Sequence, residues 1–442
     1  MSTPTISATC LDELALGHGR VITFVGVGGC GMRGLATFFL QSGWDVYGYD
    51  SKPLSSSDEL YALGLRWCDE STLPMSSWVV RSAAVPSTDP VFAESVAKDA
   101  RPSLYAQFLG EISKLRPVIA VAGTHGKTTC TAWIAYGLQE AGVDVGYLVG
   151  AKVPQLGGSS AWGDPRLPLV VESCEYARSF HFLRPQKVAL INVAAEHPDT
   201  YPGGLPEVKQ SFAEFLSHTS TDGCVYAGPE APTDLQSSTD AEWMTCPQLD
   251  LDVELGLFGD HNRRNASLVA SVLKDLGLEQ EQISHALASF SGASRRLELV
   301  GELTKGQCET IKLVSDYAHH PTEVAATINA AKQRFKDCDI NVVFQPHQAQ
   351  RFKDYRELYA DCLDEADMVA LLPIYRARDS KDCVIDSDEL IPELDARFPQ
   401  REHHFAKSID SAIDWTLANS KSSSVMLCLG AGDIDGYLRE IL

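Results

Sequence analysis

The sequence lacks the features of a membrane protein, a disulfide-stabilised scaffold and a nucleic-acid-binding surface. It has no N-terminal apolar signal segment and no apolar run near the roughly 18 residues that a membrane helix needs. It has 37 Lys and Arg against 59 Asp and Glu, which gives a net charge of −22. Such a charge argues against binding nucleic acid or an anionic membrane. The 12 cysteines form no C-x-x-C pair, so they support no zinc ribbon or redox motif and suit a reducing cytosol. We therefore expect a cytoplasmic protein, with its polar residues 1–19 frayed.

The length and the apolar pattern predict three α/β domains in series. A chain of 442 residues corresponds to about three domains of ordinary size, and 44% hydrophobic residues is typical of a globular protein. Apolar runs alternate with helical segments, which predicts mostly parallel sheets covered by helices. We expect a Rossmann-like domain at 1–115, a P-loop domain at 116–293 and a second Rossmann-like domain at 294–442. Residues 229–252 are rich in Pro, Ser, Thr and Asp, and we expect them to be a surface connection.

A phosphate-binding loop is predicted between an apolar strand at 118–122 and a helix at 129–140. In such loops, backbone N–H groups face the phosphates, a lysine reaches the outer phosphates and a hydroxyl binds Mg²⁺. The general motif has glycine where this chain has Val121, so a plain glycine turn after a buried strand is the alternative. The expected nucleotide-binding residues are Gly123, Thr124, His125, Gly126, Lys127, Thr128 and Thr129.

A second glycine-rich turn follows the first predicted strand, at 21–25. Glycines let a pyrophosphate approach the backbone, and Asp50 follows about twenty residues later, where an acidic residue can bind a ribose hydroxyl. A dinucleotide site is one interpretation of this turn, and a solvated aspartate is the alternative for Asp50. The turn glycines are Gly26, Gly28, Gly29 and Gly31.

Glu172 ends the apolar run Leu169-Val-Val171, where a carboxylate is costly to bury without a cation beside it. Mg²⁺ prefers one or two carboxylates together with phosphate oxygens and waters. We therefore expect Glu172 and Thr128 to bind a magnesium ion at the phosphates.

From residue 20 onward the chain resembles the Mur ligases, the ATP-dependent amide-forming enzymes of peptidoglycan synthesis. The resemblance rests on motifs in sequence order over about nine-tenths of the chain. Besides the phosphate loop, they are Gly26-Val-Gly-Gly-Cys-Gly-Met32, Glu172-Ser-Cys-Glu-Tyr176, Arg178-Ser-Phe180, Asn192, Glu196-His197-Pro-Asp199, Gly259-Asp-His-Asn262, Asn265, Arg295-Arg296, Asp316-Tyr-Ala-His-His-Pro-Thr-Glu323, Phe344-Gln-Pro-His347, Arg351, Tyr375-Arg-Ala-Arg378 and Gly430-Ala-Gly-Asp-Ile434.

The resemblance implies a role for each matching residue in the first two domains. The glycine turn is expected to bind the pyrophosphate of a UDP-sugar rather than a nicotinamide dinucleotide. His197 is expected to bind a second Mg²⁺, with a hydrogen-bonded loop histidine as the alternative; Glu196 replaces the aspartate that most members carry. His261, Asn262 and Asn265 are expected to line the adenine side, although Asn262 could simply cap its helix.

The third domain is expected to bind the amino acid and to reach the transferred phosphate. The resemblance places one of the pair Arg295 and Arg296 at that phosphate, with solvated charge as the alternative for both. Arg295 is grouped with the catalytic residues, and Arg296 and Asp316 are expected to bind ATP. Many members carry Gly-Glu where this chain has Arg378 and Asp379. This departure could alter the charge of the amino-acid pocket or its choice of amino acid. His319 and His320 are expected on the amino-acid side. A basic pocket for two carboxylates, that of the sugar lactyl group and that of alanine, is expected from His347, Arg351, Tyr375 and Arg378. The expected catalytic group is Lys127, Glu172, His197, Arg295 and His347.

Within the family, the chain is most similar to the ligases that join L-alanine to UDP-N-acetylmuramate through an acyl phosphate. The implied partners are UDP-N-acetylmuramate, L-alanine and ATP with Mg²⁺, and the implied assembly is a monomer or weak homodimer. Three alternatives remain: a murein tripeptide recycling ligase, a folate polyglutamate ligase, and an inactive UDP-sugar-binding regulatory homologue. The UDP-type glycine turn argues against the folate enzyme, and intact Lys127, Glu172 and His197 argue against loss of activity.

Overall fold

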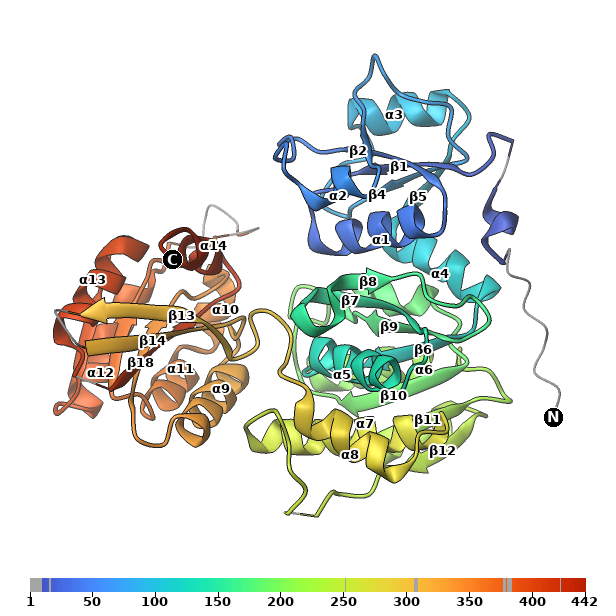
Figure 1. Cartoon of the computed structure of the whole chain (residues 1–442). Helices are drawn as coiled ribbons and strands as arrows, with labels where there is room; N and C mark the ends of the chain where they lie inside the picture. Colours follow the sequence, from blue (N-terminus) through green and yellow to red (C-terminus); the bar gives the residue numbers. More distant parts are fainter. Residues whose placement is uncertain are drawn as a thin grey trace. The chain divides into compact units, whose positions relative to one another are not determined.

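The computed structural model describes residues 10–15, 17–250, 252–305, 309–376, 379, 384–421 and 423–442. Their strands form three sheets, which lie in the three ranges expected for the domains (Figure 1). The chain divides into two compact units: Met1–Gly256 with Arg264–Ser291, and Leu257–Arg263 with Gly292–Leu442. The first unit contains two of the sheets and the second contains one, so the α/β class and the mostly parallel sheets are confirmed. The individual domain boundaries stay a prediction.

The first sheet is fully parallel and has the strand order β3-β2-β1-β4-β5. The chain runs outward from β1 through β2 to β3 and then crosses to β4 on the other side of β1. The glycine turn lies at the carboxyl end of β1, beside this switch point, where open α/β sheets bind ligands. The strands are β1 Val21–Val25, β2 Asp45–Tyr49, β3 Arg66–Trp67, β4 Trp78–Arg81 and β5 Arg101–Leu104. The helices are α1 Cys30–Gln41, α2 Glu59–Ala62, α3 Pro90–Ala97 and α4 Tyr105–Leu115.

The second sheet has the order β12-β11-β10-β6-β9-β7-β8, and only the β7–β8 pair is antiparallel. Its central strands are buried on both faces, which is why they appear in the sequence as continuous apolar runs. The strands are β6 Val118–Ala122, β7 Gly146–Val153, β8 Gly158–Ala161, β9 Leu169–Ser173, β10 Lys187–Asn192, β11 Cys224–Glu230 and β12 Glu242–Thr245. The helices are α5 Lys127–Glu140, α6 Leu205–Leu216, α7 Asp260–Asp275 and α8 Gln280–Ser289, with 3₁₀ segments η2 Pro154–Leu156, η3 Tyr176–Phe182 and η4 Thr233–Ser238.

The third sheet has the order β13-β14-β18-β15-β16-β17 and is parallel except for the β13–β14 pair. Its strands are β13 Glu298–Lys305, β14 Glu309–Asp316, β15 Asp339–Phe344, β16 Met368–Leu371, β17 Glu402–Phe405 and β18 Ser424–Leu429. Its helices are α9 Pro321–Arg334, α10 Ala349–Asp354, α11 Arg356–Leu363, α12 Ile391–Arg397, α13 Ile409–Asn419 and α14 Ile434–Glu440, with η5 Ser387–Leu390.

Two expectations about local structure were wrong. The predicted surface connection at 229–252 contains the strand β12, a four-residue edge strand whose small buried face left no clear apolar pattern. The described part of the N-terminal segment is ordered: Cys10–Leu14 forms the 3₁₀ helix η1. Leu14 is only 4% exposed, and its carbonyl accepts a hydrogen bond from Trp78 Nε1 at 2.8 Å. A short polar segment can thus be held by one apolar side chain and one carbonyl.

The first two sheets are joined by a buried arginine. Arg116, just before β6, is 1% exposed, and its guanidinium donates to three backbone carbonyls at 2.7–2.9 Å, those of Trp162, Asp164 and Leu167. The Trp162 ring in turn packs edge-on against Phe38 of α1, with ring centroids 4.9 Å apart. These contacts fix the glycine turn beside the second sheet. None of the described helices is both long enough and apolar enough to cross a membrane.

Candidate active site

The predicted phosphate loop is the turn between β6 and α5. Gly126 has a φ of +83°, a left-handed value that favours glycine, and α5 begins at the next residue. The first N–H groups of a helix have no partner within it, so this turn can bind an anion. Lys127 Nζ lies 2.7 Å from the carbonyl oxygen of Gly123 and 2.8 Å from that of Thr124, so the lysine folds back over its own loop. The predicted strand–loop–helix arrangement is confirmed.

Asn192, at the end of the neighbouring strand β10, clamps this loop. Its side-chain Oδ1 accepts from the His125 N–H at 2.9 Å, and its Nδ2 donates to the His125 carbonyl at 3.2 Å. The backbone carbonyl of Asn192 also accepts from the Thr124 N–H at 3.2 Å. The sequence analysis gave Asn192 no role, although its position at a strand end inside a family motif was the available signal.

Thr128 and Glu172 meet at the edge of the loop, as expected for a shared site. The Thr128 hydroxyl donates to Glu172 Oε1 at 2.8 Å, and the N–H of Gly150 in β7 donates to Oε2 at 2.6 Å. A Cβ atom at position 150 would lie 2.6 Å from that oxygen, so a side chain there would displace the Glu172 carboxylate. A hydroxyl and a carboxylate side by side are the hard oxygen donors that Mg²⁺ prefers. These two residues therefore fit the predicted ion, and their role as its ligands stays a prediction.

His197 lies in the same unit but contacts a different carboxylate. Its backbone has a φ of +54°, unusual for a residue other than glycine, and its Nε2 lies 3.1 Å from Glu175 Oε1. The other oxygen of Glu175, Oε2, forms an ion pair with Lys127 Nζ at 2.8 Å. Glu175 belongs to a family motif but was given no function from the sequence. Its position three residues after Glu172, just beyond the end of β9, was the available signal.

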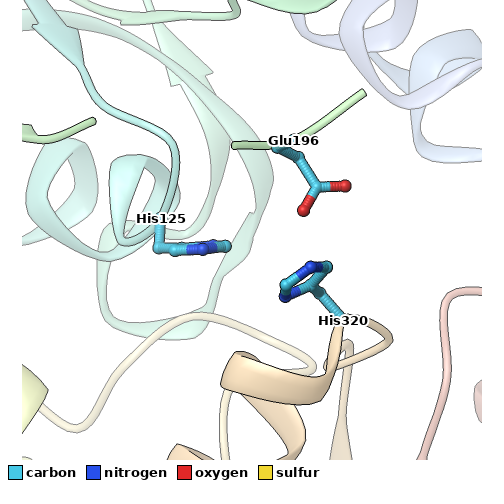
Figure 2. A group of neighbouring side chains, drawn as sticks. All are labelled: His125, Glu196 and His320. Carbon is cyan, nitrogen blue, oxygen red and sulfur yellow. The ribbon is translucent and has the colours of Figure 1, made fainter. Parts of the chain in front are cut away.

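Glu196, the residue that departs from the usual aspartate, is buried, with 8% of its surface exposed. Figure 2 shows its side chain on the loop that follows β10, and the side chain of His125, which lies in the phosphate loop between β6 and α5. A carboxylate oxygen of Glu196 and a ring nitrogen of His125 lie within 4.8 Å of each other. The longer glutamate side chain thus extends toward the phosphate loop.

The glycine turn of the first sheet is oriented by Asp50. The Gly28 N–H donates to Asp50 Oδ2 at 2.9 Å, and the Gly26 N–H donates to the carbonyl of Tyr49 at 2.8 Å. Cys30, in the first turn of α1, donates from Sγ to the carbonyl of Gly150 at 2.9 Å. The helix that follows the glycine turn therefore contacts β7, the strand that pairs with the Glu172 strand β9. Binding of a ribose by Asp50 stays a prediction.

The start of α7 supplies the predicted adenine-side residues. Asn265 is 5% exposed and lies against the phosphate loop, since a Cβ at Gly126 would be 3.0 Å from its Oδ1. Asn262 belongs to the second unit, where its Nδ2 donates to the carbonyl of Phe258 at 2.8 Å. Because α7 begins at Asp260, the alternative that Asn262 caps the helix is wrong. His261 also belongs to the second unit, beside Gly259.

Arg295 and Arg296 form an arginine–tyrosine stack in the second unit. Their guanidinium carbons lie 4.5 and 5.5 Å from the centre of the Tyr317 ring. Arg295 has a φ of +62° and donates from Nη2 to the carbonyl of Gly430 at 2.7 Å. The arginines are therefore held by packing and are not simply solvated charges. Contact with a transferred phosphate stays a prediction.

Asp316 has a structural role that its predicted nucleotide contact did not include. Its two carboxylate oxygens accept from the N–H groups of Leu297 at 2.6 Å and Ala318 at 2.8 Å. Burial raises the pKa of Asp316, against the lowering effect of the Arg296 charge and these two hydrogen bonds. The carboxylate thus fixes the backbone next to Arg296 and next to Tyr317, the ring on which both arginines stack.

The predicted amino-acid residues of the second unit form a chain of rings. His319 packs edge-on against His347, and His347 stacks on Tyr375, with centroids 5.7 Å apart in each case. Arg351 is 5% exposed, and its Nη1 lies 3.4 Å from the His347 carbonyl. His320 begins α9, where its Nδ1 accepts from the Thr322 N–H at 3.3 Å. Arg378 lies outside the described residues.

Comparison with known proteins accounts for these motifs together. The model "Mur ligase family, catalytic domain" matches residues 21–116, and "Mur ligase, glutamate ligase domain" matches residues 295–432. The UDP-N-acetylmuramate–L-alanine ligase of Chloroflexus aggregans is 33% identical, over 92% of this chain and 95% of its own length.

Solved structures share the fold. The UDP-N-acetylmuramate–alanine ligase of Thermotoga maritima matches with a TM-score of 0.77 at 23% identity, covering 95% of this chain and 97% of its own. A murein peptide ligase of Psychrobacter arcticus matches with a TM-score of 0.68 at 21% identity, covering 96% and 98%. With one-third identity to the Chloroflexus enzyme over nearly the whole chain, the protein belongs to the Mur ligase family.

Proposed function

We propose that this chain is an ATP-dependent ligase that joins L-alanine to the lactyl carboxylate of UDP-N-acetylmuramate. The observation that carries the substrate assignment is the 33% identity to a ligase of that name along 92% of the chain. The setting is the synthesis of peptidoglycan precursors. The phosphate loop supports the use of ATP, since Lys127, Thr128 and Glu172 converge on it.

The reaction consists of two displacements. An oxygen of the lactyl carboxylate attacks the γ-phosphorus of ATP, the bond from that phosphorus to the bridging oxygen breaks, and ADP leaves with the electron pair. The amine nitrogen of L-alanine then attacks the acyl carbon and loses a proton. The bond from that carbon to the phosphate oxygen breaks, and inorganic phosphate leaves. Each step needs positioned reactants and neutralised phosphoryl charge more than covalent help from the protein.

The first unit provides the groups that hold the two nucleotides. The N–H groups of the loop and of α5 bind phosphate oxygens, and Lys127 neutralises their charge. Thr128 and Glu172 would hold a magnesium ion, which supplies further charge neutralisation when bound. His197 is proposed as a ligand to a second such ion. The glycine turn beside Asp50 receives the pyrophosphate of the sugar nucleotide.

The second unit provides cationic and aromatic groups for the amino acid. Arg351 and the stacked pair His347 and Tyr375 offer donors to a carboxylate. Arg295 is proposed to stabilise the transferred phosphoryl group. Its stack on Tyr317 limits the side-chain entropy lost when a phosphate binds.

Release of ADP, measured with each substrate omitted in turn, tests this function. We expect ADP only when UDP-N-acetylmuramate is present, and one amide formed per ADP when L-alanine is added. Turnover with a murein tripeptide in place of L-alanine would identify the recycling ligase instead. Sizing of the same preparation checks the proposed monomer or weak homodimer, and cell fractionation checks the proposed cytoplasmic location.

A further inference from the structure

Glu175 is a buried carboxylate with two functional neighbours. Its side chain is 1% exposed at the start of η3, and its backbone carbonyl accepts from the Tyr201 hydroxyl at 2.6 Å. Burial alone would raise the pKa of Glu175, but the Lys127 ammonium and the His197 ring outweigh it and lower that pKa. Its Oε2 lies 2.8 Å from the Lys127 ammonium, so the carboxylate is one half of a buried ion pair. A buried charge is costly unless it is paired with an opposite charge and hydrogen-bonded, and here Lys127 and His197 provide these contacts.

The Lys127 ammonium has three acceptors around it and three N–H donors to give. Two acceptors are the carbonyl oxygens of Gly123 and Thr124, and the third is Glu175 Oε2 at 2.8 Å. Of these three, only Glu175 carries a charge. Phosphates that bind in the loop must therefore compete with Glu175 for the lysine.

The His197 ring is oriented by the other oxygen of the same carboxylate. An ionised carboxylate can only accept, so His197 Nε2 carries the proton in the 3.1 Å contact with Oε1. In the neutral ring this leaves Nδ1 with the lone pair, the arrangement found where a carboxylate fixes the tautomer of a metal-binding histidine. Glu175 thus determines which nitrogen His197 can offer to a cation.

We propose that Glu175 is a positioning residue that holds Lys127 over the phosphate loop and fixes the orientation of His197. The proposal rests on the proposed function, because it concerns the same ATP site. In the arrangement described, Glu175 neutralises the lysine. When a nucleotide binds, the lysine moves to the phosphates, and Glu175 keeps its hydrogen bond with His197. The carboxylate therefore weakens nucleotide binding but supports turnover.

The test compares Glu175→Gln with wild-type enzyme in two measurements. Calorimetric titration with ADP in magnesium-free buffer measures the competition for Lys127, and steady-state ADP release measures turnover. Glu214→Gln is the matched control, since Glu214 also faces a histidine, His181, at 3.4 Å but is 57% exposed. We expect ADP to bind about tenfold more tightly to Glu175→Gln, because a charge-assisted hydrogen bond no longer competes. We expect its turnover to fall at least tenfold, and the control to match wild type in both.

Unchanged ADP affinity and turnover in Glu175→Gln, with wild-type enzyme active, would overturn the proposal. Weaker ADP binding in that variant would overturn it too, since a purely structural glutamate would loosen the loop. If Glu175→Gln does not fold by circular dichroism, Glu175→Asp decides, because a side chain one methylene shorter cannot span both partners. Wild-type behaviour of Glu175→Asp in both measurements would then refute it. An inactive wild-type enzyme that still binds ADP would count against the proposed function instead.

Discussion

Lys127 and Glu172 contribute opposite charges to the phosphate loop, and each is held by the backbone around it. Lys127 donates to two loop carbonyls, and Glu172 accepts from Thr128 and from Gly150. Preorganised groups of this kind stabilise developing charge without reorganising during the reaction. Changes to either side chain should therefore affect turnover far more than folding.

Lys127→Ala should keep the fold and lower turnover on the order of 10²- to 10³-fold, because one preorganised charge at the phosphates is lost. Circular dichroism and the rate of ADP release, measured on one preparation, check this. Lys114→Ala is the control, because that lysine is 52% exposed and forms an ion pair with Glu111 in the same helix. A near-wild-type rate for Lys127→Ala would mean that ATP binds elsewhere.

Glu172→Gln should raise the Mg²⁺ concentration needed for half-maximal activity more than His197→Ala does. Mg²⁺ prefers oxygen ligands, and the Glu172 carboxylate lies beside the Thr128 hydroxyl, whereas histidine is an unusual ligand for this ion. Activity titrated against Mg²⁺ for both variants measures the difference. A shift in the histidine variant alone would reverse this ranking.

At the scale of elements, the phosphate loop depends on three strands and two helices. β6 leads into the loop, α5 follows it, β10 contributes Asn192 and β9 contributes Glu172. From α7, Asn265 packs against Gly126 at the point where the backbone is left-handed. The loop is thus supported from several directions, and a Cβ at Gly126 would disturb both the backbone and Asn265.

Gly126→Ala should destabilise the protein and weaken ADP binding. The added Cβ strains the left-handed backbone by about 1 kcal/mol and displaces the Asn265 side chain. Gly142→Ala isolates the strain, because Gly142 has a similar φ of +79° but no atom within 4 Å of an added Cβ. Thermal unfolding and ADP titration of both variants give the comparison. Equal effects of the two substitutions on ADP affinity would show that the contact with Asn265 is unimportant.

At the scale of the whole molecule, the proposed nucleotide sites lie mainly in the first compact unit and the proposed amino-acid residues in the second. The first two sheets are joined within one unit by Arg116 and by the pair Phe38 and Trp162. The third sheet, with His347 and Tyr375, forms a unit of its own. Phosphoryl transfer can therefore precede the arrival of the amine.

With ATP, UDP-N-acetylmuramate and Mg²⁺ but no amino acid, the enzyme should form an acyl phosphate. Borohydride reduction should trap it as the alcohol of the lactyl group, and L-alanine should divert it to the amide with one phosphate released per ligation. His347→Ala should spare the trapped alcohol and raise the L-alanine requirement, since His347 is proposed to act on the amino-acid side. Formation of AMP or of an alanine adenylate would contradict the mechanism.

Much of the fold could be predicted because buried parallel strands and their helices have simple patterns. The strands Val21–Val25, Asp45–Tyr49 and Val118–Ala122 appear as expected. The pattern failed where few side chains are buried, as in the edge strand β12, and where a helix is interrupted. Helices α10 and α11, for example, are separated by Tyr355, whose backbone is not helical.

The sequence by itself determined the three α/β sheets, the two glycine turns and the identity of most candidate site residues, because these depend on local spacing and residue type. Only the tertiary structure decided which side chains meet. Glu175 contacts Lys127 across 48 positions and His197 across 22, and Asn192 reaches the phosphate loop from 67 positions away. Such contacts depend on strand order, in which β10 and β9 flank β6, and local sequence patterns do not encode strand order.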